Sequence, residues 1–178
     1  MAFDGEGILL EAGDAVLGCD VLGRLNDALV RLGSERFLTA IYARVEPGPP
    51  GASVHLCSGG HPPGFVLRAD ESVEIIEAVH GMLLGVFPDV ELADQTIVLH
   101  SGDALVLVTD GVLEARDGKG NEFGYERLSG LLGTCAGRSA EGIARRIERS
   151  VLDHRGDRAD DDLAVMVLRA SAHRPALR

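Results

Sequence analysis

The sequence predicts an α+β fold of the sandwich class, and two observations carry that prediction. Strand-like stretches, with alternating or unbroken apolar residues, follow one another through the middle of the chain. Two amphipathic helical patterns and one closing strand come after them. At 178 residues, the chain is long enough to bury a sizeable core. The predicted domain covers 20–170, between an irregular N-terminal arm over 1–19 and a polar tail over 171–178.

The elements are expected in a definite order. Leucines at helical spacing predict a helix that begins at the N-cap Asp20 and ends at Gly33. Strands are predicted next, over 37–46, 52–57, 65–68, 72–78, 95–99 and 104–109. Two helices follow, from about 123 to 135 and from Ser139 to about Gly156, before a last strand over 163–169.

Composition and charge narrow the classes of function. The formal net charge of −11 argues against nucleic acid and anionic membranes as partners, and it suits cations or a basic partner. No stretch approaches the roughly 18 apolar residues of a membrane span, and the N-terminus lacks the basic region of a signal peptide. The cysteines Cys19, Cys57 and Cys135 are expected to be buried thiols in a reducing compartment. These features predict a cytoplasmic protein.

Two acidic blocks lie at the ends of predicted strands. Asp110 follows the apolar run 104–108, and three adjacent acids, Asp160 to Asp162, directly precede the apolar run 163–168. Carboxylates fixed in this way are the ligands that Mg²⁺ and Mn²⁺ use. However, Asp-Gly also commonly marks a simple turn, and a run of acids also suits a solvated turn. From the residues alone, both interpretations stay open.

A corner rich in glycine and proline, Gly59-Gly-His-Pro-Pro63, contains a histidine. His61 could serve as a ligand or as an acid–base group. A single histidine in a turn is more often structural, and the sequence identifies no partner for this one.

Six motifs, in this order, resemble one family over about residues 20 to 169. They are Arg36-Phe-Leu-Thr-Ala-Ile-Tyr42, Gly59-Gly-His-Pro-Pro63, Leu84-Gly-Val-Phe-Pro-Asp89, Ser101-Gly-Asp-Ala-Leu-Val-Leu-Val-Thr-Asp-Gly-Val-Leu-Glu-Ala115, Glu122-Phe-Gly-Tyr-Glu-Arg-Leu128 and Asp161-Asp-Leu-Ala164. Together they are similar to the metal-dependent (PPM-type) serine/threonine protein phosphatases, in the branch of bacterial stage II sporulation protein E and the stress-response sigma-regulating phosphatases.

The resemblance implies a PPM-type two-sheet β-sandwich flanked by helices, with two Mn²⁺ or Mg²⁺ ions at one edge. Asp110 and Asp161 match metal-ligand aspartates of the family. Asp162 stands where the family varies between Asp and Asn, so no direct ligation is expected, and His61 matches a signature to which no catalytic role is assigned. The implied reaction is hydrolysis by a metal-activated water, without catalytic groups beyond the metal ligands. The implied substrate is phosphoserine or phosphothreonine on an anti-sigma-factor antagonist protein.

The sequence departs from the family in one block. Family members carry an upstream Gly-Asp-Val-x-Gly-x-Gly block whose Asp bridges both metals, and a standard version is missing here. We therefore expect an N-terminally truncated domain that lacks the first strands and the first helix. Phe3-Asp-Gly-Glu-Gly7 echoes the block, but only twelve residues separate it from the helix at Asp20, so Asp4 is not expected to replace the ligand. The alternative function is a catalytically impaired module that binds a regulatory partner.

Lacking those strands, the predicted sheet would keep an uncovered edge, which is a template for pairing with another chain. We therefore expect homodimerisation through the exposed sheet edge, or reduced solubility. Light scattering at increasing micromolar concentrations checks this prediction, and a monodisperse monomer throughout the range contradicts it.

Overall fold

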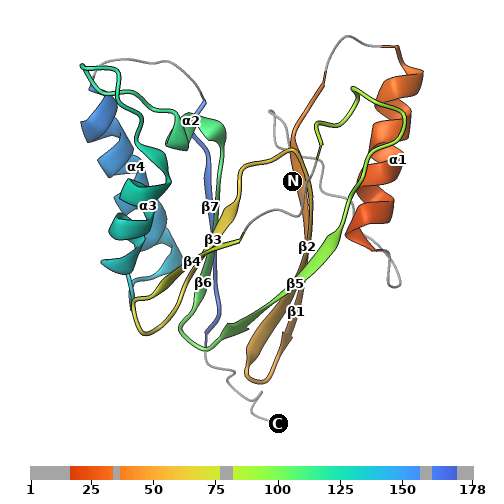
Figure 1. The fold of residues 1–178 in the computed structure, drawn as a ribbon. Coiled ribbons are helices and arrows are strands. Elements are labelled where there is room, and N and C mark those ends of the chain that lie inside the picture. Colours follow the sequence, from red (N-terminus) through yellow and green to blue (C-terminus); the bar gives the residue numbers. More distant parts are fainter. Residues whose placement is uncertain (1–16, 34–36, 77–81, 157–161, 172–178) are drawn as a thin grey trace. The chain divides into compact units, whose positions relative to one another are not determined.

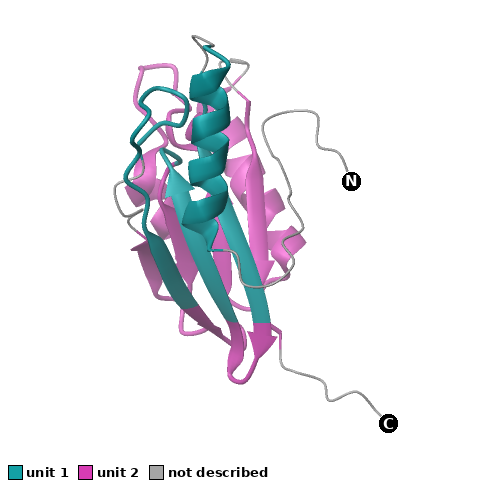
Figure 2. Ribbon diagram, turned by 90° about the vertical axis from the view of Figure 1, so that its right-hand side faces the viewer, with its two compact units in different colours: residues 1–46, 53–61, 78–97 teal, residues 47–52, 62–77, 98–178 magenta. Residues whose placement is uncertain are grey.

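The computed structural model describes residues 17–33, 37–76, 82–156 and 162–171, and Figure 1 shows its helices and strands. The chain divides into two compact units (Figure 2). The α1 unit comprises residues 1–46, 53–61 and 78–97, and the α4 unit comprises residues 47–52, 62–77 and 98–178.

In its described residues, the α1 unit contains one helix and most of a three-stranded sheet. Helix α1 spans Gly18–Arg31, and the sheet has the strand order β1-β2-β5. The strands are β1 (Ala40–Gly48), β2 (Gly51–Gly59) and β5 (Asp94–His100). Helix α1 packs its leucine stripe into a small core around Leu22, Cys57 and Leu84. The N-cap is Leu17 rather than the predicted Asp20, which lies in the first turn, where a carboxylate still complements the helix dipole.

A buried asparagine ties α1 to the loop before β5. Asn26 is fully buried, and its Nδ2 donates to the carbonyl oxygen of Phe87 at 2.9 Å. Its Oδ1 accepts a hydrogen bond from the Gly85 N–H at 2.8 Å. Because both ends of the amide are satisfied, Asn26 fixes the loop without the cost of an unpaired buried polar group.

The α4 unit is built on an antiparallel four-stranded sheet with the order β4-β3-β6-β7. The strands are β3 (Gly64–Leu67), β4 (Val73–Ile76), β6 (Ala104–Val108) and β7 (Val165–Arg169). All five residues of β6 are buried, as their unbroken apolar run predicts. The β3–β4 hairpin confirms the prediction from sequence, and its turn contains the only described non-glycine residue with positive φ, Glu71.

Three helices accompany this sheet: α2 (Asp110–Leu113), α3 (Gly124–Gly133) and α4 (Ala140–Arg155). The prediction for α4 is confirmed, because the Ser139 hydroxyl accepts the Gly142 N–H at 3.1 Å and Gly156 ends the helix with φ of 64°. Apolar side chains of α3 and α4 share one core with β3, β6 and β7. Its fully buried members include Phe65, Val106, Leu128, Leu132, Ile143, Ile147 and Val151.

The observed elements agree with the predicted order but not with every predicted bound. The strand predicted from 37 begins at Ala40, the closing strand begins at Val165 instead of 163, and the short helix α2 was not predicted. The observed α+β fold contains two sheets, and the face-to-face packing expected for a sandwich stays a prediction. Among the described residues, no helix has the length and apolar character needed to cross a membrane.

A buried carboxylate, that of Asp103, lies directly before β6. Asp103 is 2% exposed and accepts hydrogen bonds from Arg68 Nη1 at 2.8 Å, from the Ala69 N–H and from the His100 N–H, both at 2.9 Å. Burial raises the pKa of Asp103, but the hydrogen bonds and the charge of Arg68 outweigh it, so that the pKa lies below its usual value. Arg68 also forms an exposed ion pair with Glu74 at 2.8 Å.

We expect Asp103→Asn to lower the free energy of unfolding by about 3 kcal/mol, because Arg68 loses the buried negative charge opposite it and at least one N–H donor of the site then faces the amide NH2 group instead of an oxygen. Since the pKa of Asp103 is lowered on folding, its ionised form stabilises the fold above a pH of about 3.9 and loses that effect as the pH falls. Urea unfolding at neutral and acidic pH measures both effects.

The matched control is Glu74→Gln, which removes the exposed partner of the same arginine and should cost below about 1 kcal/mol. Equal losses in the two variants would contradict the assignment of the buried pair as the stabilising one.

Candidate metal site

The sequence-predicted ligand Asp110 lies where the buried strand β6 gives way to helix α2. The three residues after it, Gly111 to Leu113, are buried, while Asp110 itself is exposed. Its Oδ1 accepts the Gly111 N–H at 3.0 Å, and its carbonyl oxygen accepts the Glu114 N–H at 2.8 Å. The backbone is therefore anchored in the core on both sides of a carboxylate that faces outward.

In the described part of the chain, no basic side chain pairs with this carboxylate. Among the ion pairs formed by described residues, none includes Asp110. A fixed, exposed carboxylate oxygen matches the hard oxygen ligands that Mg²⁺ and Mn²⁺ prefer. The donor chemistry therefore fits such a cation, although Asp110 belongs to no group of three clustered acidic, histidine or cysteine ligands in the described part of the chain.

Thr109 joins this strand end to the second acidic block. Its hydroxyl donates to the Asp162 carbonyl oxygen at 3.1 Å and accepts the Ala164 N–H at 3.0 Å. Its own N–H donates to the Ala164 carbonyl oxygen at 3.1 Å. These three bonds hold the backbone of 162–164 against Thr109, the residue that precedes Asp110.

The other sequence-predicted residues have different outcomes. Asp161 and Asp4 lie outside the described residues, so the ligand role of Asp161 stays a prediction. Asp162 is exposed and its carbonyl oxygen contacts Thr109. His61 lies in the α1 unit, half-buried, with Nδ1 3.5 Å from the Thr39 hydroxyl.

Sequence reasoning missed the part played by Thr109. Its side chain bonds to residues 53 and 55 positions away, and no local pattern reveals such a contact. The available signal was the position of a hydrogen-bonding threonine between a buried strand and an aspartate.

Comparison with known proteins shows which proteins this chain is similar to. The model of the family "Stage II sporulation protein E (SpoIIE)" matches residues 15–171. Among curated proteins, the phosphoserine phosphatase RsbU of Bacillus subtilis (strain 168) is 29% identical over 153 residues, which is 84% of this chain. The match covers 44% of RsbU, so the chain spans less than half the length of that relative.

Solved structures show the same fold. The manganese-presoaked phosphatase domain of SpoIIE from Bacillus subtilis has a TM-score of 0.61 at 16% identity, over 97% of this chain and 81% of that chain. RsbX in complex with magnesium has a TM-score of 0.57 at 17% identity, over 83% of this chain and 62% of that chain. At these identities the likeness concerns the fold alone.

We expect Thr109→Val to increase hydrogen exchange at the Ala164 amide about tenfold, because this N–H loses its acceptor, and to lower the free energy of unfolding by about 1 kcal/mol. Exchange measured by mass spectrometry or NMR checks the first effect. Thr134→Val is the control, since the Thr134 hydroxyl contacts only neighbours in the sequence among the described residues: it donates to the Leu131 carbonyl oxygen at 2.7 Å and lies 4.0 Å from the Cys135 sulfur. Unchanged exchange at Ala164 would contradict the role given to Thr109.

Proposed function

We propose that this chain, which belongs to the stage II sporulation protein E family of phosphatase domains, hydrolyses phosphoserine or phosphothreonine on a bacterial sigma-factor regulator with the help of Mn²⁺ or Mg²⁺. The observation that carries the proposal is the exposed carboxylate of Asp110, fixed between β6 and α2 directly after Thr109, which holds the backbone of 162–164.

Asp110 and Asp161 are the residues that would hold the cation. The Oδ1 of Asp110 already accepts a backbone N–H, which orients the carboxylate. The Thr109 hydrogen bonds hold residues 162–164, which follow Asp161 in the sequence, close to the same strand end. A bound divalent cation lowers the pKa of a coordinated water and offsets the negative charge of the phosphate. The residues of this chain act by position and charge, and none is required as a nucleophile.

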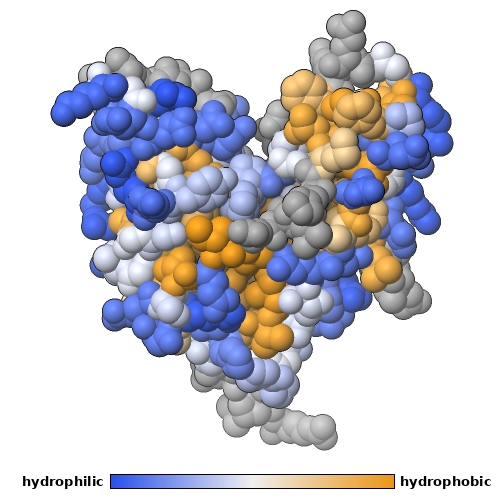
Figure 3. All heavy atoms as spheres, viewed as in Figure 1, coloured by the Kyte–Doolittle hydropathy of each residue, from blue (hydrophilic) through white to orange (hydrophobic). Residues whose placement is uncertain are grey.

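An exposed apolar segment in the α1 unit supports a protein as the substrate. Met82, Leu83, Val86 and Phe87 expose 38–51% of their surface within six residues of chain. Leu38 pairs with Leu84, which brings the exposed Phe37 to the same segment. Figure 3 shows apolar atoms gathered over this part of the α1 unit. Contiguous exposed apolar surface of this kind is typical of protein-binding sites. We assign the partner as a phosphorylated anti-sigma-factor antagonist.

We expect the full chain to hydrolyse a small aryl phosphate only with millimolar Mn²⁺ or Mg²⁺, and Asp110→Asn to reduce that rate about 100-fold or more, because the neutral amide is a much weaker ligand. Steady-state assays with and without chelator measure this. A thermal shift supplies a second readout: Mn²⁺ should raise the melting temperature of the wild type, but less that of Asp110→Asn.

The matched control is Asp153→Asn, which removes one exposed carboxylate from α4 and should leave both readouts unchanged. Metal-dependent turnover that disappears only in Asp110→Asn supports the phosphatase. Absence of turnover in the folded wild type would refute it in favour of the catalytically impaired, partner-binding module.

A further inference from the structure

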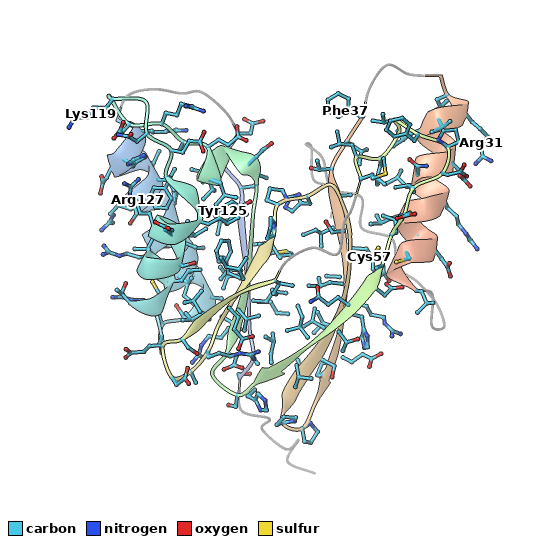
Figure 4. The ribbon with its side chains drawn as sticks, viewed as in Figure 1. Arg31, Phe37, Cys57, Lys119, Tyr125 and Arg127 are labelled. Atoms are coloured by element: carbon cyan, nitrogen blue, oxygen red, sulfur yellow. The ribbon has the colours of Figure 1, made fainter. Side chains whose placement is uncertain are left out.

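Two cysteines far apart in the sequence meet in the α1 unit. Cys19 lies in the first turn of α1 and Cys57 lies in β2, and their sulfur atoms are 3.0 Å apart. Figure 4 shows Cys57 beside the start of α1. Asp94, the first residue of β5, completes the cluster, and its Oδ1 accepts the Cys19 N–H at 3.3 Å.

The close approach of the two sulfurs is a consequence of the backbone packing. Gly18 begins α1, and a Cβ built on it would lie 2.9 Å from the Cβ of Cys57 and 2.8 Å from the ring of Tyr42. Only glycine therefore allows the first turn of the helix to lie this close to β1 and β2. Cys57 is 1% exposed, so its side chain is held in place by the core, while Cys19 is half-buried and reachable from solvent.

The chemistry of this pair favours a covalent bond over a metal ion. A disulfide needs only the two sulfurs, with a bond of about 2.05 Å, and these lie about 1 Å further apart than that. A structural zinc site takes four protein ligands, whereas the described residues of the cluster supply three, one of which is a carboxylate that already accepts a backbone hydrogen bond.

We propose that Cys19 and Cys57 form a disulfide bond when the protein meets a peroxide, and that this bond locks the start of α1 to β2. The accessible Cys19 thiolate attacks a peroxide oxygen, which yields a sulfenic acid and water after proton uptake. The Cys57 thiolate then attacks the Cys19 sulfur and releases a second water after protonation. In total, two thiols and one hydrogen peroxide give one disulfide and two waters.

The environment makes this a slow reaction. Burial raises the pKa of Cys19 and of Cys57, and the charge of Asp94 raises both further, so few thiolates form at neutral pH. The bond is therefore a stabilising cross-link that accumulates under sustained oxidation, rather than a rapid sensor.

The test uses the full chain, treated for hours with hydrogen peroxide or with a thiol reductant, followed by trypsin digestion without reduction. We expect one cross-linked species that joins peptide 1–24 to peptide 45–68, with the loss of two hydrogen atoms. The third cysteine is the internal control, because Cys135 is fully buried in the α4 unit and should stay a thiol in peptide 128–138. The oxidised protein should melt roughly 5 °C or more above the reduced protein.

The variants Cys19→Ser and Cys57→Ser should each abolish both the cross-link and the oxidation-dependent melting shift, and Cys135→Ser should keep them. Peptide mapping of the wild type decides the matter even where a variant fails to fold. The proposal is overturned by three results: no cross-link in the folded wild type, cross-links that involve Cys135 equally, or stoichiometric zinc that blocks both thiols until a chelator removes it.

Discussion

The burial of β6 is the constraint on which the α4 unit depends. Its five residues are covered on both faces, and its backbone is hydrogen-bonded to β3 on one side and to β7 on the other. A strand held in this way cannot slip, because a shift of one residue would exchange the side chains of its two faces. The residues immediately before and after β6, the buried Asp103 and the half-buried Thr109, are therefore held as firmly as the core itself.

In the α1 unit, one glycine and one buried asparagine determine how the helix is held. The missing side chain of Gly18 sets the approach of α1 to the sheet, and the amide of Asn26 fixes the loop that follows the leucine at 84. The leucine stripe supplies the hydrophobic driving force but not this specificity, because apolar contacts alone are not directional. A buried, fully satisfied amide adds a preferred orientation.

The sequence predicted those features that follow from local patterns. The helix stripe of α4, the serine and glycine at its two ends, the β3–β4 hairpin and the buried run of β6 all depend on neighbouring residues. Asp20 failed as the predicted N-cap because the helix already begins at Gly18, four residues before Leu22, the first leucine of the stripe. The start at Gly18 depends on the packing of this turn against the strands, which the leucine stripe does not reveal. The contacts of Thr109 with 162–164 and of Cys19 with Cys57 connect distant segments, so no local pattern could reveal them.

The two aspartates that flank β6 show why sequence alone left the metal site open. Asp103 and Asp110 both stand next to the same apolar run, and both resemble turn residues. In the structure, Asp103 is buried and accepts hydrogen bonds from Arg68 and from two backbone N–H groups. These partners offset its negative charge, and the interaction stabilises the fold. Asp110 is exposed, receives one backbone N–H and has no described basic partner, so its charge remains available to a ligand. The fold therefore distinguishes the two carboxylates by their partners. Asp103 has partners that offset its charge and stabilises the structure, whereas the exposed Asp110 is the one proposed to bind a cation.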